Sequence, residues 1–445
     1  MNMLQLVERN SFGRIKSFRM HDIVRELTVD LCQTECFGTA YSDEDKQGDS
    51  TEEKDGRRMV IHRLTEDVNE TIISNLHRLR SLTALDNSTA SSSKILPAIV
   101  HNSRYMSVLE LTGLPIENVP DAIGDLFNLR HLGLRDTKVK LLPNSIEKLS
   151  NLMTLDLYNS EIEELPRGIV KLKKLRHLFA EKVSDRHGRQ LRCRTGVRIP
   201  KGLEKLTELQ TFQGLEAQDD PLKRLGELRQ MRSIKIWDVK GSYCERLCAS
   251  LRQMEFLSYL SIVASDENEI LNLNSLNPLP PNLGRVWLGG RLAQGDMLLD
   301  ATMAGGQNIN HPLFSVNLCW SQLTEDPLPT LTLWSNLTEL GLTRAYVGEQ
   351  LVFLQGWFPK LKELELRDMP NLKRVEIQQG AMTSLEELYL TNLPAMTNVP
   401  SGIEFLQPAL KYLAFWEITE ESLTVLSQCS RIDSIPCQYT LDSDA

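Results

Sequence analysis

Apolar and polar positions in the middle of the chain follow a fixed interval of 23 residues. Four columns keep this interval over three periods: Pro120, Pro143 and Pro166; Ile123, Ile146 and Ile169; Leu129, Leu152 and Leu175; and Leu132, Leu155 and Leu178. Around the leucines, the pattern LxxLxL alternates apolar and polar residues, which predicts a short strand with one buried face. The proline that follows ends strand pairing, and the pattern xxIxxLxxL then predicts a short helix or 3-10 turn.

This interval and leucine spacing are typical of leucine-rich repeats. No single period can bury its own leucines, so neighbouring periods must stack and their strands must form one parallel sheet. The predicted fold is an α/β leucine-rich-repeat solenoid, a horseshoe with a parallel concave sheet and short helices or 3-10 turns on the convex side. Further strand-start anchors follow less regularly at Leu209, Met231, Leu257, Leu283, Leu313, Leu337, Leu361, Leu385 and Leu410.

The pattern divides the chain into a repeat domain of about fourteen repeats at residues 59–438 and three other segments. Residues 40–58 are polar and acidic, which predicts a flexible linker, and residues 439–445 form a tail. Residues 1–39 combine two short strands around Gly13 with an amphipathic helix, a unit too small to hold its own core. Inside the repeat domain, residues 292–312 carry no repeat pattern.

Composition narrows the partners and the location. The formal net charge is −9, which opposes nucleic acid as a partner because its phosphates would be repelled on average. No run of 18 apolar residues is present, and the first residues lack the apolar core of a signal peptide. We therefore expect a cytoplasmic protein whose eight cysteines are free thiols, mostly packed, and no metal site.

His21 beside Asp22 invites a catalytic interpretation. Neighbours on a helix point about 100° apart, however, so the two side chains are poorly placed to pair. The chain contains no G-x-S-x-G, H-E-x-x-H or Walker A sequence, and therefore no motif that would supply a nucleophile, a zinc ion or a phosphate cradle. We expect no enzymatic activity and no catalytic residue.

The open face of the predicted sheet offers a surface for a protein partner instead. Its candidate partner-binding residues are aromatic side chains, which are favoured anchors in interfaces, and glutamates: Trp237, Tyr259, Trp287, Tyr389 and Trp416; and Glu339, Glu363, Glu365 and Glu387. Glu339, Glu363 and Glu387 fall in one column of successive repeats, where their mutual repulsion favours a basic ligand. The alternatives are a hydrated acidic face and aromatic side chains that pack among themselves.

Residues 181–198 insert a basic segment into one repeat of this acidic chain. The segment could dock an acidic partner or phosphate. We favour a solvated insertion, because surface loops accept added residues readily.

The sequence RMHDIVRELTVDLC at residues 19–32 resembles the end of the nucleotide-binding module of plant nucleotide-binding, leucine-rich-repeat immune receptors of the coiled-coil class. Met20, His21 and Asp22 match the Met-His-Asp motif of that family, and repeats such as FPKLKELEL and GAMTSLEELYL are similar to its repeat domain. The resemblance identifies residues 1–39 as a winged-helix remnant and covers nearly the whole chain.

The resemblance implies a function in plant defence. It implies that the repeats recognise a pathogen effector or a guarded host protein and restrain signalling, and that His21 is a vestigial sensor of nucleotide phosphates. A nucleotide-binding module of a related receptor would be a further partner. No cofactor is expected in this chain, because ADP or ATP would need the phosphate-binding module that lies upstream in the family. Two alternatives stay open: a nucleotide-controlled switch in a longer product, and a general intracellular scaffold.

Overall fold

The computed structural model describes residues 4–9, 15–20, 39–41, 57–61, 77–85, 95–185, 190–293, 310–418 and 437–441. The chain forms two compact units, residues 1–178 and residues 179–445. His21 and most of the predicted linker at residues 40–58 lie outside the described residues, so the proposed sensor and the predicted segment boundaries stay predictions.

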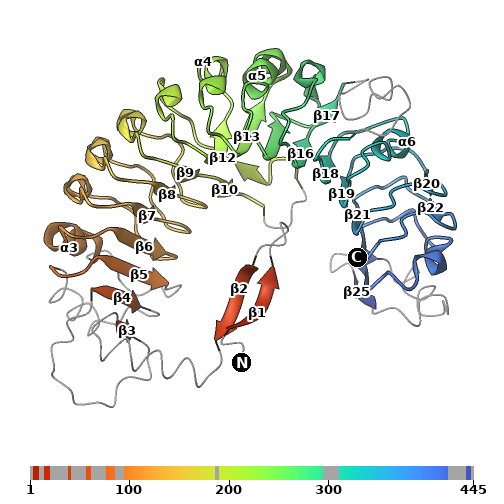
Figure 1. Cartoon of the computed structure of the whole chain (residues 1–445), viewed down its shortest axis with the longest axis horizontal. Coiled ribbons are helices and arrows are strands. Elements are labelled where there is room, and N and C mark those ends of the chain that lie inside the picture. Colours follow the sequence, from red (N-terminus) through yellow and green to blue (C-terminus); the bar gives the residue numbers. More distant parts are fainter. Residues whose placement is uncertain are drawn as a thin grey trace. The chain divides into compact units, whose positions relative to one another are not determined.

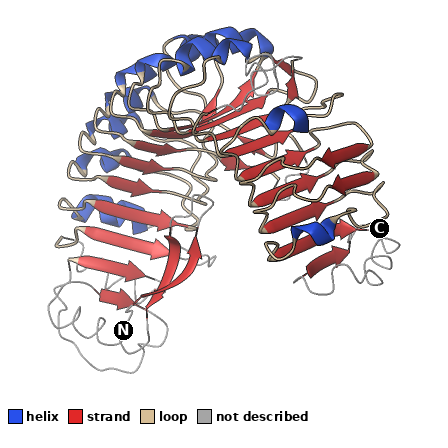
Figure 2. Cartoon of the chain, turned by 45° about the vertical axis from the view of Figure 1, so that its right-hand side comes forward, coloured by secondary structure: helices blue, strands red, loops and turns tan. Residues whose placement is uncertain are grey.

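Unit 1 contains a parallel sheet whose strands pair in chain order (Figure 1). The strands are β3 (Thr39–Tyr41), β4 (Arg58–Ile61), β5 (Ser81–Leu85), β6 (Val108–Thr112), β7 (His131–Gly133) and β8 (Thr154–Asp156). The helical elements are α3 (Ile95–Asn102) and the 3-10 turns η2 (Asp121–Asp125), η3 (Asn144–Lys148) and η4 (Arg167–Lys171). They lie on the side of the repeats away from the strands (Figure 2).

The columns of the sequence pattern are the core of this unit. The leucines and isoleucines of all three periods are fully buried, and Leu155 has no exposed surface. Pro120, Pro143 and Pro166 each stand directly before a 3-10 turn with an extended backbone, because a residue without an N–H donor is tolerated where a turn begins. The predicted strand, proline and turn of each period are confirmed.

Two strands lie before these repeats. β1 (Leu4–Arg9) and β2 (Ile15–Met20) pair in antiparallel fashion on either side of Gly13, as the sequence predicts. β9 (His177–Phe179) then spans the boundary between the two units.

Unit 2 contains a second run of parallel strands. They are β12 (Thr211–Glu216), β13 (Ser233–Val239), β14 (Tyr259–Ala264), β16 (Arg285–Gly289), β18 (Ser315–Cys319), β19 (Glu339–Thr343), β21 (Glu363–Arg367), β23 (Glu387–Thr391), β24 (Tyr412–Ile418) and β25 (Cys437–Leu441). From β12 to β24, each strand begins two residues after its predicted anchor. The irregular repeats are therefore placed correctly by the sequence.

Short elements complete unit 2. The helices and 3-10 turns are η5 (Leu203–Lys205), α4 (Asp219–Lys223), η6 (Leu225–Glu227), η7 (Gly241–Tyr243), α5 (Cys244–Leu251), η8 (Asn274–Leu276), α6 (Leu328–Leu331) and η10 (Ile403–Leu406). Three small sheets pair β10 (Lys182–Val183) with β11 (Arg194–Thr195), β15 (Ile270–Leu271) with β17 (Arg291–Leu292), and β20 (Gln350–Phe353) with β22 (Arg374–Ile377).

The segment without a repeat pattern does not interrupt the sheet. Residues 294–309 lie outside the described residues, but β16 pairs directly with β18, with Arg285 opposite Ser315 and Gly289 opposite Cys319. The repeats on either side of the segment are thus neighbours. The strands on either side of an insertion can stay paired when the inserted chain loops out from the array and returns to the position where the next strand begins.

Candidate protein-interaction surface

The glutamates of the sequence pattern lie side by side on the sheet of unit 2. The register places Glu339 opposite Glu363 and Glu363 opposite Glu387, while Leu340, Leu364 and Leu388 alternate with them into the core. Neighbouring strands in a sheet are about 4.8 Å apart, so the three carboxylates form a row with close spacing. The predicted column is therefore present as a row of half-buried acids.

The two ends of this row have partners, and its centre does not. Arg285 forms an ion pair with Glu339 at 2.9 Å, and the Tyr389 hydroxyl donates a hydrogen bond to Glu387. Among the described residues, no hydrogen bond or ion pair reaches the Glu363 carboxyl. Burial raises the pKa of Glu363 to about 7, with added repulsion from Glu339 and Glu387.

Glu365 follows on the same strand and faces the same side as Glu363. It is half-buried, and desolvation raises the pKa of its carboxyl group, although nearby Arg367 opposes the shift. Two acids on β21 are therefore held in an environment that disfavours their charge.

Three aromatic side chains stand next to the row of glutamates. Tyr389 packs against Tyr412 and Trp416 with ring centroids 5.6 and 5.4 Å apart, and the three rings form an aromatic cluster on β23 and β24. Each ring is partly exposed. The sequence left two alternatives for these aromatic side chains, which were contact with a partner and packing among themselves. The rings of the cluster pack together and also keep an exposed surface.

The aromatic residues at the start of unit 2 are placed differently. Trp237 is only 5% exposed and packs against Trp287 at 6.4 Å between ring centroids. Strand alternation predicts Trp237 on the open face. Trp287 lies on that same face, opposite Ser261 of β14, and the packing of the two rings helps to withdraw Trp237 from solvent. Tyr259 is also withdrawn from solvent, and burial raises the pKa of its hydroxyl to about 12.

The basic insertion packs against its own sheet where the structure describes it. Glu181 is 1% exposed and pairs with Lys235 at 3.0 Å and Arg194 at 3.3 Å. Arg192 pairs with Asp238 at 2.9 Å, and Leu191 is buried. The described part of the insertion is therefore anchored to the sheet by Glu181 and Leu191, while Arg192 stays exposed, so the expectation of a solvated insertion holds only in part. One feature of the sequence could have pointed to this packing: the acidic residue Glu181 lies between two strands at the start of the basic segment.

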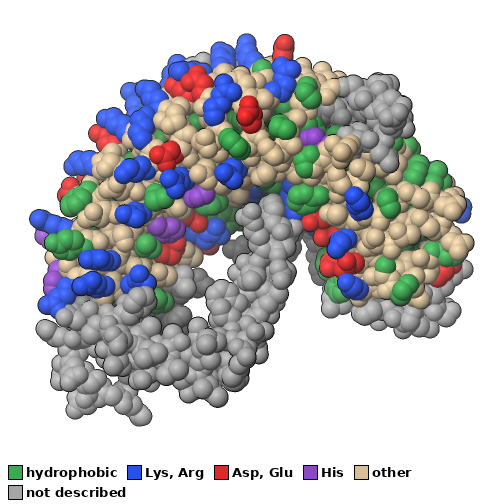
Figure 3. Space-filling view, in the orientation of Figure 1, with side chains coloured by type: hydrophobic (Ala, Val, Ile, Leu, Met, Phe, Trp, Pro, Cys, Tyr) green, Lys and Arg blue, Asp and Glu red, His purple; other side chains and the backbone are tan. Residues whose placement is uncertain are grey.

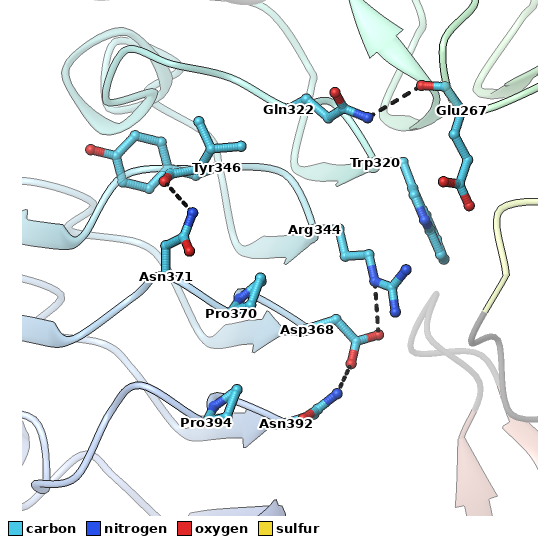
Figure 4. Close-up of a pocket in the computed structure, with 11 residues that line it drawn as sticks. Glu267, Trp320, Gln322, Arg344, Tyr346, Asp368, Pro370, Asn371, Asn392 and Pro394 are labelled. Atoms are coloured by element: carbon cyan, nitrogen blue, oxygen red, sulfur yellow. Dashed lines mark hydrogen bonds and ion pairs between the residues drawn. The ribbon is translucent and has the colours of Figure 1, made fainter.

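A pocket of about 290 Å³ opens beside the ends of β18, β19, β21 and β23 (Figure 4). It is lined by Glu267, Trp320, Gln322, Arg344, Tyr346, Val347, Asp368, Pro370, Asn371, Asn392 and Pro394. None of these residues belongs to the surface that the sequence predicts. One feature of the sequence could have pointed to the pocket. The position directly after a strand is Asp or Asn in other repeats, but it is Trp320 in one repeat and Arg344 in the next.

The charges of the molecule are unevenly distributed. Lys and Arg side chains gather on the helical side of the first repeats, and acidic side chains gather on the strand side of the C-terminal repeats (Figure 3). In the part of the chain that the structure describes, no cluster of His, Cys, Asp and Glu could hold a metal ion. No helix in that part of the chain is both long enough and apolar enough to cross a membrane.

Four of the described cysteines carry no disulfide. Cys193, Cys244, Cys248 and Cys319 are free thiols, and all except Cys193 are buried. For these four residues the expectation of free thiols, mostly packed, is confirmed.

Comparisons with known proteins agree with this architecture. A family model described as a leucine-rich repeat region matches residues 78–424. A solved leucine-rich-repeat protein from Leptospira interrogans has a similar fold, with a TM-score of 0.53 and 16% identity over 86% of this chain and 89% of that one.

The sequence relatives are plant proteins. Disease resistance protein RPM1 of Arabidopsis thaliana is 34% identical over 407 residues, which are 91% of this chain and 42% of the relative. A probable disease resistance protein of the same plant is 27% identical over 429 residues, or 90% of this chain and 44% of that protein. The chain spans about two fifths of the length of these curated relatives. It belongs to the leucine-rich-repeat family, and its sequence relatives are plant disease resistance proteins.

Proposed function

We propose that this chain acts in plant defence, in the cytoplasm, as a non-enzymatic recognition domain. It would bind a pathogen effector or a guarded host protein through the sheet of unit 2 and restrain signalling until that partner is engaged. The repeat architecture and the named resistance relatives support this proposal. The observation that carries it is the row of glutamates beside the aromatic cluster.

The chemistry of this surface favours a partner that presents basic side chains. Glu363 lacks an internal partner among the described residues, and its raised pKa marks a carboxylate that gains most from a cation. A guanidinium or ammonium group between Glu363 and Glu365 would offset both carboxylates with charge-assisted hydrogen bonds. Tyr389 and Trp416 would contact the aliphatic stem of the same side chain or an adjacent apolar residue.

The test is affinity purification from plant leaf extracts with the whole chain as bait. Three baits are compared: wild type, a site variant with Glu339, Glu363 and Glu387 changed to Gln, and a control variant with Glu245, Glu255 and Glu325 changed to Gln. The control glutamates are exposed and lie away from the row. The two variants carry the same change in net charge, so non-specific attraction of basic proteins changes equally.

We expect a protein retained by the wild type and the control to be lost by at least tenfold with the site variant. Extracts from infected and healthy leaves separate a pathogen-dependent partner from the constitutive partner of a general scaffold. Equal retention by all three baits would contradict the proposed surface.

We also propose that this chain holds no nucleotide, because its 445 residues contain no Walker A sequence to cradle phosphates. Nucleotide released by denaturing gently purified protein is measured by chromatography. Stoichiometric ADP that is lost in His21→Ala would favour the nucleotide-controlled switch instead.

A further inference from the structure

The pocket beside the ends of β18, β19, β21 and β23 has an unusual backbone. The residue after a strand adopts a positive φ in several repeats, and this conformation is tolerated best by Asn and Asp. Asp368 and Asn392 follow that rule, and the Asn392 amide donates a hydrogen bond of 2.7 Å to the Asp368 carboxylate. Trp320 and Arg344 occupy the same position with φ of 55° and 48°. Large side chains are therefore held in a strained conformation at the pocket.

Trp320 brings an unpaired donor to this place. The residue is 4% exposed, and its indole Nε1 has no hydrogen-bond partner among the described residues. A buried N–H group without an acceptor is costly, and such groups are rare in folded proteins. The indole forms one wall of the pocket, beside Arg344 (Figure 4).

Arg344 adds a positive charge that is only loosely compensated. Its guanidinium lies over the Trp320 ring at 5.5 Å, and its closest approach to the Asp368 carboxylate is 3.9 Å, too long for a hydrogen bond. Asp368 is also shared with Arg367 at 3.7 Å. Two guanidinium groups thus face one buried carboxylate. The other lining acid, Glu267, is exposed, and its charge is screened by solvent.

We propose that this pocket receives the side-chain carboxylate of an acidic residue on a partner protein. Arg344 would hold the carboxylate with the two parallel hydrogen bonds of its planar fork, and the Trp320 Nε1, which is buried in this structure, would donate a third once the ring turns toward the pocket. The volume of about 290 Å³ is at the lower limit of small-molecule sites and suits one side chain. Pro370 and Pro394 supply apolar contacts for its methylene groups.

This site is separate from the proposed basic-ligand surface, because it uses none of the glutamates in the row. A result that contradicts one of the two proposals therefore leaves the other untouched. The glutamate variant with Glu339, Glu363 and Glu387 changed to Gln should keep the pocket, and changes at Arg344 should keep the row.

The first test follows the indole N–H signals of the six tryptophans by NMR on the whole chain. Trp320→Phe assigns the signal of Trp320. The probes are N-acetyl-glutamate N-methylamide and its uncharged twin N-acetyl-glutamine N-methylamide. We expect the glutamate probe alone to shift the Trp320 signal downfield, and we expect Arg344→Gln to abolish the shift. Arg291→Gln, which removes an exposed arginine of unit 2, should preserve it.

The second test identifies the source of the carboxylate. Random heptapeptides displayed on phage are selected on the wild-type chain, and each enriched peptide is then measured on the variants. We expect a shared Asp or Glu, with binding weakened about 10- to 100-fold by Arg344→Gln and less by Arg344→Lys, which keeps the charge but loses the fork. Thermal unfolding of each variant confirms that it is folded.

Three results would overturn the proposal. The glutamate and glutamine probes could shift the Trp320 signal equally, or the enriched peptides could share no acid or bind Arg344→Gln as well as the wild type. Peptides that bind no more tightly than the capped glutamate would point to a free small acid rather than to a partner protein.

Discussion

At the scale of single residues, the charged form of Glu363 is destabilised more than the charged forms of its neighbours Glu339 and Glu387. Arg285 compensates Glu339 and the Tyr389 hydroxyl contacts Glu387, whereas Glu363 lies half-buried between them. Desolvation is the largest cause of its raised pKa, and the two flanking carboxylates add to it. Removing a charge from water without a partner is unfavourable, so the protonated form of Glu363 is the stable one over much of the acid range.

This penalty predicts a pH dependence. The carboxyl binds its proton more tightly in the folded chain, with a pKa of about 7, than in the unfolded chain near 4.5, so the free energy of unfolding falls as the pH rises through this window. Glu363→Gln removes the titration and should flatten the fall. Above pH 7 the variant should be more stable than the wild type.

Urea unfolding of the wild type and Glu363→Gln at half-unit steps from pH 4 to pH 8 measures this effect. Glu255→Gln, a change of an exposed residue, is the control and should keep the wild-type profile. Parallel profiles for the wild type and Glu363→Gln would show that Glu363 is not destabilised by its surroundings.

At the scale of elements, the strand β12 departs from the regular alternation at one point. Its pairing with β13 shifts between Gln213 and Leu215, and Gly214 occupies the extra position with φ of 106°. The Gly214 carbonyl accepts a hydrogen bond of 2.8 Å from the Val197 amide, which fastens the end of the basic insertion to the sheet. The bulge therefore accommodates the insertion without breaking the sheet.

Gly214→Ala should destabilise the chain by about 2–4 kcal/mol, from a positive φ and from overpacking. A Cβ atom at Gly214 would lie 2.5 Å from the Ala180 carbonyl carbon. Gly356→Ala is the matched control, because Gly356 also has a positive φ but no atom within 4 Å of a built Cβ. Its cost should be only about 1–2 kcal/mol. Similar midpoints of urea unfolding for both variants would argue against a steric role for Gly214.

At the scale of the whole molecule, stability is built from contacts between adjacent repeats. Strands pair with their nearest neighbours in each unit, and the leucine columns are buried between them. In such arrays the loss of one buried side chain weakens its own repeat and the interfaces on either side. Distant repeats keep their contacts.

Leu155→Ala tests this locality. The side chain is fully buried, so the substitution should cost about 2–5 kcal/mol. Hydrogen exchange should accelerate in β7, β8 and η3, while β19 to β23 keep their protection. Leu364→Ala, at the corresponding position of unit 2, should give the reverse pattern. Uniform acceleration along the chain would mean that the repeats unfold as one cooperative body.

The periodic part of the fold could be predicted because every repeat buries its leucines against neighbouring repeats in the same way. Leu152 and Leu155 must be buried by neighbours of the same design, and Pro143 ends pairing by its own covalent structure. The same logic placed Glu339, Glu363 and Glu387 in one row, because register in a parallel array follows from the repeat interval. The anchors Leu283 and Leu313 fixed β16 and β18 although the residues between them have no pattern.

The tertiary structure alone decided which side chains are compensated and which are exposed. Glu181 pairs with Lys235 and Arg194, which are 54 and 13 positions away, and Trp237 packs against Trp287, which is 50 positions away. The pocket at Trp320 and Arg344 likewise depends on the loops of five repeats, which follow β14, β18, β19, β21 and β23. A repeating pattern determines the positions of strands because it acts locally. Burial and charge pairing depend on contacts between distant residues, and only the folded chain brings those together.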